Sequence, residues 1–143
     1  MATVRKELVT QASVEAVWDA IRDVGALHTR LVPGFVTATT LENGTRRVTF
    51  ANGLTVHEPI VTIDDAERRL VWSSAGGKTT HYNASAQAFP EGGRTKVVWI
   101  ADFLPNDAAP AIDTAMTAGI AAMQKALDKL GPAAGNTQLA RRR

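Results

Sequence analysis

An acidic side chain on an apolar strand is the first candidate for chemistry in this sequence. In the segment 50–65, FANGLTVHEPIVTIDD, Glu58 lies two residues from both Val56 and Ile60, so these three side chains should share one face of a strand. A carboxylate on such a face must be paired with a cation, hydrogen-bonded or protonated. Pro59 lacks a backbone donor, which predicts a bulge or an edge position at that point.

The sequence leaves two interpretations of Glu58 open. In one, the carboxylate binds a polar group of a ligand, directly or through water. In the other, it forms a structural pair with backbone groups or with an arginine, and Arg30 is the candidate. Tyr82 could likewise donate a hydrogen bond inside the fold or be a core aromatic. His57 has the opposite parity to Glu58 and is expected to face outward.

Other familiar chemistries find little support. The three histidines are scattered and the chain has no cysteine, so the spacing of zinc ligands is missing. The sequence contains no G-x-S-x-G, P-loop or G-x-G-x-x-G pattern. We therefore expect neither a metal nor another cofactor.

Length and composition indicate one globular domain. A chain of 143 residues can bury a substantial core, and the lack of cysteine excludes disulfides. No apolar run approaches the roughly 20 residues that cross a bilayer. The N-terminal segment MATVRKELVT lacks the apolar stretch of a signal peptide. We therefore expect a cytoplasmic protein without membrane insertion.

The positive charge of the chain is concentrated at one end. The net charge is +2, and Arg141, Arg142 and Arg143 supply much of the excess. The rest of the chain is close to neutral and lacks the clustered basic residues that nucleic-acid binding normally needs. A nucleic-acid partner is therefore not expected.

Periodicity predicts one strand, two short helices, six further strands and one long helix. Ser13 is the expected N-cap of a helix over 14–23, and ALHTRL predicts a second short helix that ends at Pro33-Gly34. Short turns rich in glycine, asparagine and aspartate separate the later strands, which predicts an antiparallel meander. The strands are expected at about 3–10, 35–42, 45–51, 54–63, 68–74, 79–89 and 94–103.

An amphipathic helix is predicted from Asp107 to Gly131-Pro132. Its apolar residues recur three or four positions apart: Ile112, Met116, Ile120, Met123, Leu127 and Leu130. One long helix can cover the apolar face of a curved antiparallel sheet. We therefore expect a single α+β domain over residues 1–132, followed by a flexible tail at 133–143.

The element order and several segments resemble the START-like superfamily, also called Bet v 1-like or SRPBCC. The supporting segments are SVEAVWDAIRDVGALHTRLVPGF, DDAERRLVW, HYNASAQAF and TKVVWIADFLP, and the resemblance covers about residues 3–130. It is closest to bacterial polyketide cyclase/dehydrase-like members. The resemblance implies the helix-grip fold, a curved antiparallel seven-stranded sheet around a long C-terminal helix, with two short helices after the first strand.

The resemblance also implies a deep, mainly apolar cavity between the sheet and the long helix. Three alanines that alternate on one strand, Ala84, Ala86 and Ala88, either leave part of that volume free or let the helix pack close. The candidate ligand-binding residues are Arg30, Phe50, Val56, Glu58, Ile60, Tyr82, Ala84, Trp99, Met116, Ile120 and Met123.

Plant abscisic-acid receptors share this plan, and two of their loops close the pocket. Those loops resemble ANGL at 51–54 and SAGGKTTHY at 74–82 in this chain. The short helix that contains His28 is also expected near the opening. The candidate residues of the pocket mouth are therefore His28, Asn52, Gly53, Leu54, Gly76, Gly77 and His81.

Three functions remain as hypotheses. The favoured one is binding of a small, largely hydrophobic ligand, such as a lipid, a polyketide or a hormone-like molecule. The alternatives are a cyclase, aromatase or dehydratase that uses the same pocket, and a ligand-dependent protein-interaction module. The sequence contains one inward acid but no evident acid–base pair with a third orienting group, which favours binding over catalysis. Both a monomer and a homodimer are compatible with it.

Overall fold

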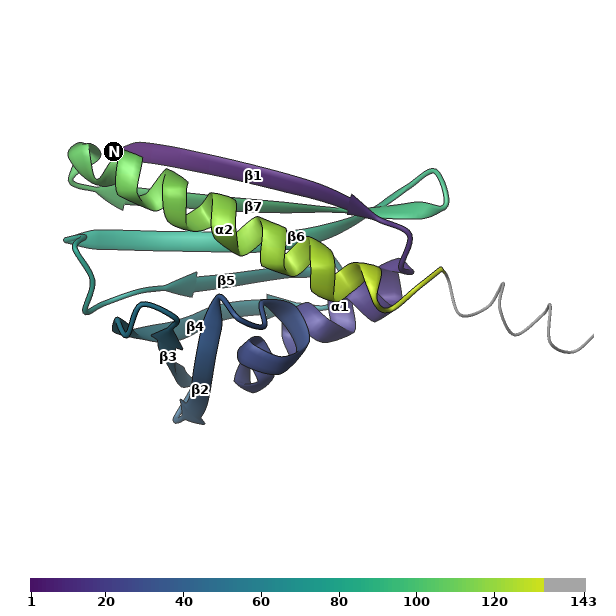
Figure 1. Ribbon diagram of the computed structural model, residues 1–143, viewed down its shortest axis with the longest axis horizontal. Coiled ribbons are helices and arrows are strands. Elements are labelled where there is room, and N and C mark those ends of the chain that lie inside the picture. The colour runs from purple at the N-terminus through teal and green to yellow at the C-terminus, as the bar shows by residue number, and fades with distance from the viewer. Residues whose placement is uncertain (133–143) are drawn as a thin grey trace, which may run out of the picture.

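A computed structural model describes residues 1–132, so the tail expected at 133–143 lies outside the described residues. The strands and helices follow the predicted order (Figure 1). They are β1 (Ala2–Thr10), α1 (Val14–Arg22), β2 (Val36–Glu42), β3 (Thr45–Phe50), β4 (Thr55–Asp64), β5 (Arg69–Ser73), β6 (His81–Glu91), β7 (Arg94–Leu104) and α2 (Ala109–Asp128). A 3-10 turn (Val24–Ala26) and a π-helical turn (Leu27–Leu31) follow α1, and a second 3-10 turn (Asn106–Ala108) precedes α2.

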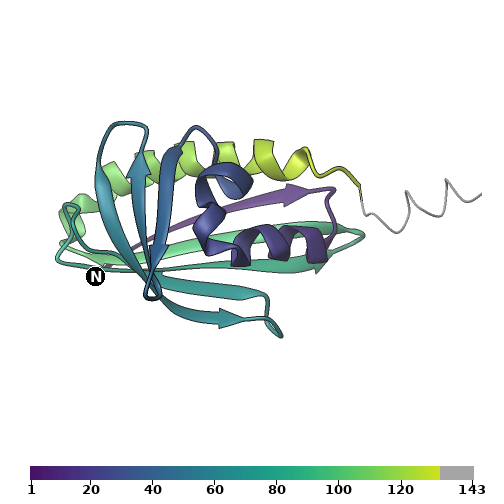
Figure 2. The ribbon, with the colours of Figure 1, turned by 90° about the horizontal axis from the view of Figure 1, so that it is seen from below.

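The seven strands form one antiparallel sheet in the order β1-β7-β6-β5-β4-β3-β2. Consecutive hairpins join β2 to β7, and β1 pairs with β7 at the edge of the sheet. The long helix α2 crosses one face of the sheet (Figure 1), and Figure 2 shows β2 and β3 running steeply across the direction of β6 and β7. The α+β helix-grip fold expected from the sequence is therefore confirmed.

Local sequence signals explain both helices. Ser13 caps α1, because its hydroxyl accepts a hydrogen bond from the backbone N–H of Ala16 over 3.1 Å. Apolar residues three or four positions apart lie on one face of α1, and this face is buried against the sheet. On α2 the buried stripe consists of Met116, Gly119, Met123 and Leu127. These four residues place one face of α2 against the sheet along the length of the helix.

Pro59 lies where β4 changes its pairing partner. Residues 55–59 pair with β3, residues 60–64 pair with β5, and the register shifts between Ile60 and Thr62. The N–H of His57 donates to the carbonyl of Ala75, on the β5 side of β4. Pro59 is two residues further along the strand, so its nitrogen, which has no hydrogen to donate, faces the same side. β4 is an interior strand. The predicted bulge is therefore present, and the predicted edge position is wrong.

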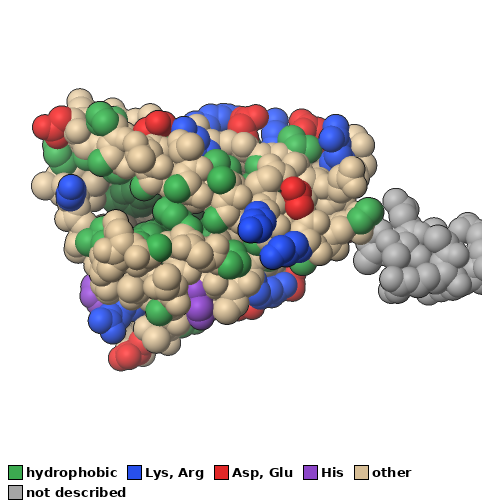
Figure 3. Space-filling view, in the orientation of Figure 1, with side chains coloured by type: hydrophobic (Ala, Val, Ile, Leu, Met, Phe, Trp, Pro, Cys, Tyr) green, Lys and Arg blue, Asp and Glu red, His purple; other side chains and the backbone are tan. Residues whose placement is uncertain are grey.

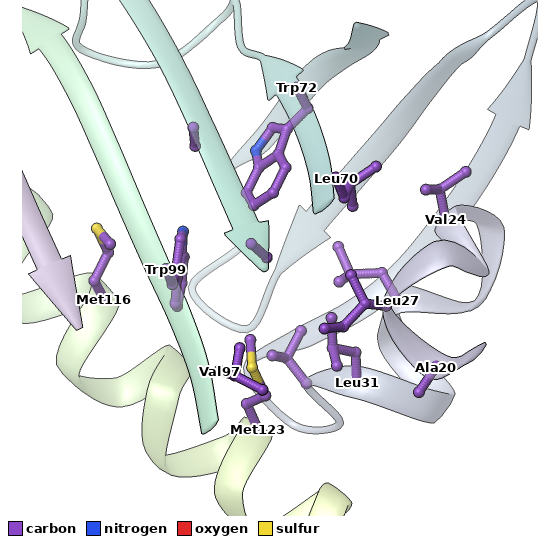
Figure 4. Packing of buried hydrophobic residues seen from close by; sticks show 14 of the residues in the cluster. Ala20, Val24, Leu27, Leu31, Leu70, Trp72, Val97, Trp99, Met116 and Met123 are labelled. Carbon is purple, nitrogen blue, oxygen red and sulfur yellow. The ribbon is translucent and has the colours of Figure 1, made fainter. Parts of the chain in front are cut away.

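The hydrophobic core lies between the sheet, α1, the turn at 24–31 and α2. Figure 4 shows these side chains converging from the strands and the helices. Phe103, Ile21, Leu70 and Leu127 are among its largest fully buried side chains. The core is continuous, but it does not fill all the space beneath α2.

Candidate ligand-binding cavity

A cavity of about 600 Å³ lies between the concave face of the sheet and α2. Figure 3 shows a hollow on this face with hydrophobic side chains inside it. Most of its lining is apolar: Leu27, Leu31, Val32, Phe35, Val36, Phe50, Leu54, Val56, Leu70, Trp72, Ala86, Trp99, Pro105, Ala108, Ala111, Ile112, Ala115, Met116 and Met123. Its other lining residues are Arg46, Asn52, Glu58, Ser74, Gly77, Lys78, Thr79, Tyr82 and Asp107. The volume lies in the range of ordinary small-molecule sites.

A buried ion pair is the main polar feature of this cavity. Arg46 on β3 and Glu58 on β4 are direct cross-strand partners, and Arg46 Nε donates to Glu58 Oε1 over 2.7 Å. Their side chains are 3% and 9% exposed. The guanidinium carbon of Arg46 also lies 5.1 Å from the ring centre of Trp72. The indole thus covers one side of a cation that water cannot solvate.

The ion pair leaves hydrogen-bonding capacity unused. Among residues 1–132, Glu58 Oε2 and the hydroxyl of Tyr82 have no hydrogen-bond partner, and Arg46 Nη1 is buried without one. The bridge therefore uses one nitrogen and one oxygen where a bidentate pair would use two of each. This arrangement can accept further hydrogen bonds from a molecule in the cavity.

Burial dominates the protonation of the acidic groups here. It raises the pKa of Glu58 above the usual value for a carboxyl group, while the charge and hydrogen bond of Arg46 act in the opposite direction. Burial also raises the pKa of Tyr82, and the nearby carboxylate of Glu58 adds to that effect. Tyr82 therefore keeps its proton at neutral pH and can donate a hydrogen bond into the cavity.

Arg30 is not the partner of Glu58. Its guanidinium binds Asp19 over 2.7 Å and Asp23 over 3.0 Å, and its side chain is 36% exposed. In the π-helical turn, Leu27 and Leu31 face the cavity while Arg30 points toward the acidic residues of α1 and its C-cap. The expected role of Arg30 in the cavity was wrong for this reason.

The residue that sequence reasoning missed is Arg46. It has the same strand parity as Phe50, which was expected to bind a ligand in the cavity. The hairpin centred on Asn52 sets Phe50 opposite Leu54, and the same register sets Arg46 opposite Glu58. Parity and turn position together were therefore the signal that could have found this pair.

The decisive comparison covers almost the whole chain. Residues 1–135 match the model of a family described as polyketide cyclase/dehydrase and lipid transport. The chain belongs to this family. The predicted START-like membership is thereby confirmed, and no curated protein sequence matches the chain.

Solved structures with low sequence identity share the fold. An uncharacterised protein from Bacillus thuringiensis aligns with a TM-score of 0.78 and 22% identity over 88% of this chain and 98% of its own. Norcoclaurine synthase from Thalictrum flavum aligns with a TM-score of 0.67 and 22% identity over 90% and 92%. The di-domain ARO/CYC BexL from the BE-7585A biosynthetic pathway aligns with a TM-score of 0.76 and 16% identity over 90% of this chain and 47% of its own. These likenesses concern the fold.

Most residues expected to bind a ligand are in the cavity lining. Phe50, Val56, Glu58, Tyr82, Trp99, Met116 and Met123 line it. Ala84 is buried in the core outside the lining, and Ile60 and Ile120 are half-buried at its margin. Ile60 stands at the bulge of β4, and Ile120 lies one helical position away from the buried stripe of α2. The structure adds Phe35, whose segment was predicted only as the start of a strand.

The two loops expected at the mouth both border the opening. Asn52, Leu54 and Gly77 line the cavity, whereas Gly53, Gly76, His28 and His81 do not. The side chain of Asn52 accepts from the N–H of Leu54 over 2.9 Å, and Gly53 adopts a φ of 90°, which holds this loop in a tight turn. The exposed charged residues of the lining are Lys78, which lies in the second of these loops, and Asp107, which was not expected there.

No histidine lines the cavity described by residues 1–132. Within the same residues, no three metal-ligating side chains come together in a possible metal site. None of the helices in this part of the chain is both long and apolar enough to cross a membrane. The buried polar residues of the lining are Arg46 and Glu58, and Tyr82 is half-buried beside them. The other polar lining residues are half-buried (Ser74 and Thr79) or exposed (Asn52, Lys78 and Asp107).

Proposed function

We propose that this protein binds a small, largely apolar molecule in the cavity beneath α2, with one polar group of that molecule at Glu58 and Tyr82. The apolar lining favours an apolar body, because burying it removes hydrophobic surface from water. The free oxygen of Glu58 and the hydroxyl of Tyr82 offer an acceptor and a donor. The observation that carries the proposal is this pair of unused polar groups inside an apolar cavity.

A neutral polar group is the best match for this site. Arg46 and Glu58 carry opposite charges, so an added charge would meet attraction and repulsion together. A hydroxyl or an enol could instead donate to Glu58 Oε2 and accept from Tyr82. We infer that the ligand presents such a group and no full charge at this end.

A second candidate function is proton transfer to or from the bound molecule, as a cyclase or dehydratase requires. It is supported by Glu58, whose pKa is raised and whose second oxygen is unpaired, next to Tyr82 in the same cavity. A carboxyl group that holds its proton more tightly can act as a general acid and, once ionised, as a general base. Product formation that is measured by mass spectrometry and lost in Glu58→Gln would favour this function over binding alone.

Calorimetric titration with 2-naphthol and 2-methylnaphthalene tests the binding proposal. The two probes have nearly the same shape, but only the first has a hydroxyl group. The wild-type protein should prefer 2-naphthol, and Glu58→Gln and Tyr82→Phe should each reduce this preference by up to about tenfold, as expected for loss of one hydrogen bond. Tyr82→Phe keeps the ring stacked on Phe103, so it tests the hydroxyl with little change in packing.

The control variant is Glu42→Gln, which changes the same chemical group on an exposed position of β2. It should bind both probes like the wild-type protein. Failure of the wild-type protein to bind either probe contradicts the proposal. Equal preference for 2-naphthol in the wild-type, Glu58→Gln and Tyr82→Phe proteins contradicts the role of the polar pair.

A further inference from the structure

The middle of α2 carries a glycine in a helix that is otherwise rich in alanine. A glycine inside a helix weakens it relative to alanine, so packing must explain it. A methyl group at Gly119 would lie 2.8 Å from Cη2 and Cζ3 of Trp99 and 3.1 Å from Cε2 of Phe35. Carbon atoms in contact usually lie about 3.5–4.0 Å apart. Both aromatic rings therefore rest on helix backbone that a side chain would cover.

These two rings reach the helix from opposite ends of the sheet. Trp99 belongs to β7, next to one edge strand, and Phe35 immediately precedes β2, the other edge strand. Both line the cavity. Phe35 also makes an edge-to-face contact with Phe50, with ring centres 5.3 Å apart. Both rings therefore contact α2 at one point of the cavity lining.

The cavity lining continues along α2 on both sides of Gly119. Along α2, Met116 lies about 4.5 Å before Gly119 and Met123 about 6 Å after it, and both methionines line the cavity. The exposed lining residues of this helix, Ala111 and Ala115, all precede Gly119. The mouth is therefore on the Met116 side of Gly119.

The inner end of the cavity consists of buried Leu27, Leu31 and Met123. In Figure 4, Trp99 lies between Met116 on one side and these three residues on the other. Trp99 therefore stands between the two ends of the lining in this view.

Only packing holds Trp99 in this position within the described chain. Its side chain is buried, and its indole N–H has no hydrogen-bond partner among residues 1–132. A ring without a hydrogen bond is free to shift when its contacts change. The contact at Gly119 is therefore one of the packing contacts that position the indole.

We propose that Trp99 and Phe35, seated on Gly119, form a size filter that sets how far a rigid fused-ring ligand extends from the mouth toward the inner end. This inference rests on the proposed binding function and adds the residues that determine ligand size. A methyl group at position 119 would push the indole into the cavity by roughly 1 Å. A smaller ring at position 99 would widen the passage.

The test is fluorescence titration of the full chain with 2-naphthol, 9-phenanthrol and 1-hydroxypyrene, which have two, three and four fused rings and one hydroxyl each. Relative to 2-naphthol, Gly119→Ala should weaken 1-hydroxypyrene by about tenfold and Trp99→Phe should strengthen it by a similar factor, the effect of about one methylene group in an apolar pocket. The control Ala118→Ser adds one atom on the exposed face of α2 and should leave the ratio unchanged.

The outcomes separate the size filter from the function it rests on. If the wild-type protein binds none of the three probes, the proposed function is overturned and the filter with it. If the wild-type protein binds them but both variants keep the wild-type ratio of affinities within about twofold, only the filter is overturned. Should Gly119→Ala fail to fold by circular dichroism, Trp99→Phe decides alone.

Discussion

At the scale of single residues, the buried pair of Arg46 and Glu58 is the most consequential feature. A buried ion pair often contributes little net stability, but removing one partner leaves an uncompensated charge inside the protein. The pair here is nearly inaccessible to water and is joined by a single hydrogen bond. In the proposed function, its free carboxylate oxygen receives a polar group of the ligand.

Arg46→Met removes the cation and keeps much of the side-chain volume. Because Glu58 would then remain buried without a partner, we expect the free energy of unfolding at about pH 8 to fall by about 3–5 kcal/mol. The double variant Arg46→Met/Glu58→Gln should recover most of this loss. Urea denaturation measures all of these changes. As a control, Arg5→Met breaks the exposed pair with Glu7, which solvent screens, so the free energy of unfolding should change far less than in Arg46→Met.

The raised pKa of Glu58 predicts how its contribution to stability changes with pH. A carboxyl group with a raised pKa holds its proton more tightly in the folded state, so its stabilising contribution is complete below the ordinary pKa of 4.5. That contribution is lost as pH rises through the pKa of the folded state. The stability of the wild-type protein minus that of Glu58→Gln should therefore decline from about pH 4 to pH 8. A flat or rising difference would contradict the assigned shift.

At the scale of elements, α2 combines two opposing demands. Its alanines and methionines form a helix that covers the sheet, while Gly119 admits Trp99 and Phe35 to its backbone. Alanine at this position would favour the helix by about 1 kcal/mol. Overpacking a filled site typically costs about 1–3 kcal/mol. The steric effect is therefore the larger of the two.

We expect Gly119→Ala to lower the free energy of unfolding by up to about 2 kcal/mol, the net of these two effects. In the Trp99→Phe background the same change should cost less by about 1 kcal/mol or more, because the indole carbons that the methyl group meets are absent. Urea denaturation of the two single variants and the double variant measures this coupling. Additive effects would show that Trp99 does not press on α2 at Gly119.

At the scale of the whole molecule, the fold leaves space where a densely packed core would place side chains. Protein interiors are normally as dense as organic crystals, so a cavity of about 600 Å³ is a cost in stability. The alternating alanines of β6 differ in whether they line the cavity or pack in the core. Ala86 lines the cavity, whereas Ala84 and Ala88 are buried in packed core. Stability and ligand binding thus make opposite demands on one strand.

Ala86→Leu should stabilise the protein by about 1 kcal/mol, because it fills part of the cavity. The same change should weaken binding of 2-naphthol, since it occupies the ligand's space. The matched control is Ala88→Leu, which has no cavity beside it and should destabilise the protein by about 1–3 kcal/mol. Thermal unfolding and fluorescence titration measure the two effects. Destabilisation by Ala86→Leu would mean that the space beside this residue is not available to a ligand.

The sequence by itself determined the order of the elements and the face on which most side chains lie. Turn residues and periods of two or about 3.6 residues are local properties of the chain, so they are readable without a structure. This is why Glu58 was expected inward and His57 outward, and why the long helix and the six-strand meander were predicted correctly. The missing backbone donor of Pro59 predicted either a bulge or an edge position, and a register shift lies just after it, between Ile60 and Thr62.

Only the tertiary structure decided which of these side chains meet. Arg46 was overlooked and Arg30 was preferred, because the choice depends on how β3 pairs with β4 and on which way a five-residue turn faces. The separation of Ala86 from Ala84 and Ala88, and the seating of Trp99 on Gly119, depend on how α2 lies over the curved sheet. These are contacts between residues far apart in the chain, and local periodicity carries no information about their distances.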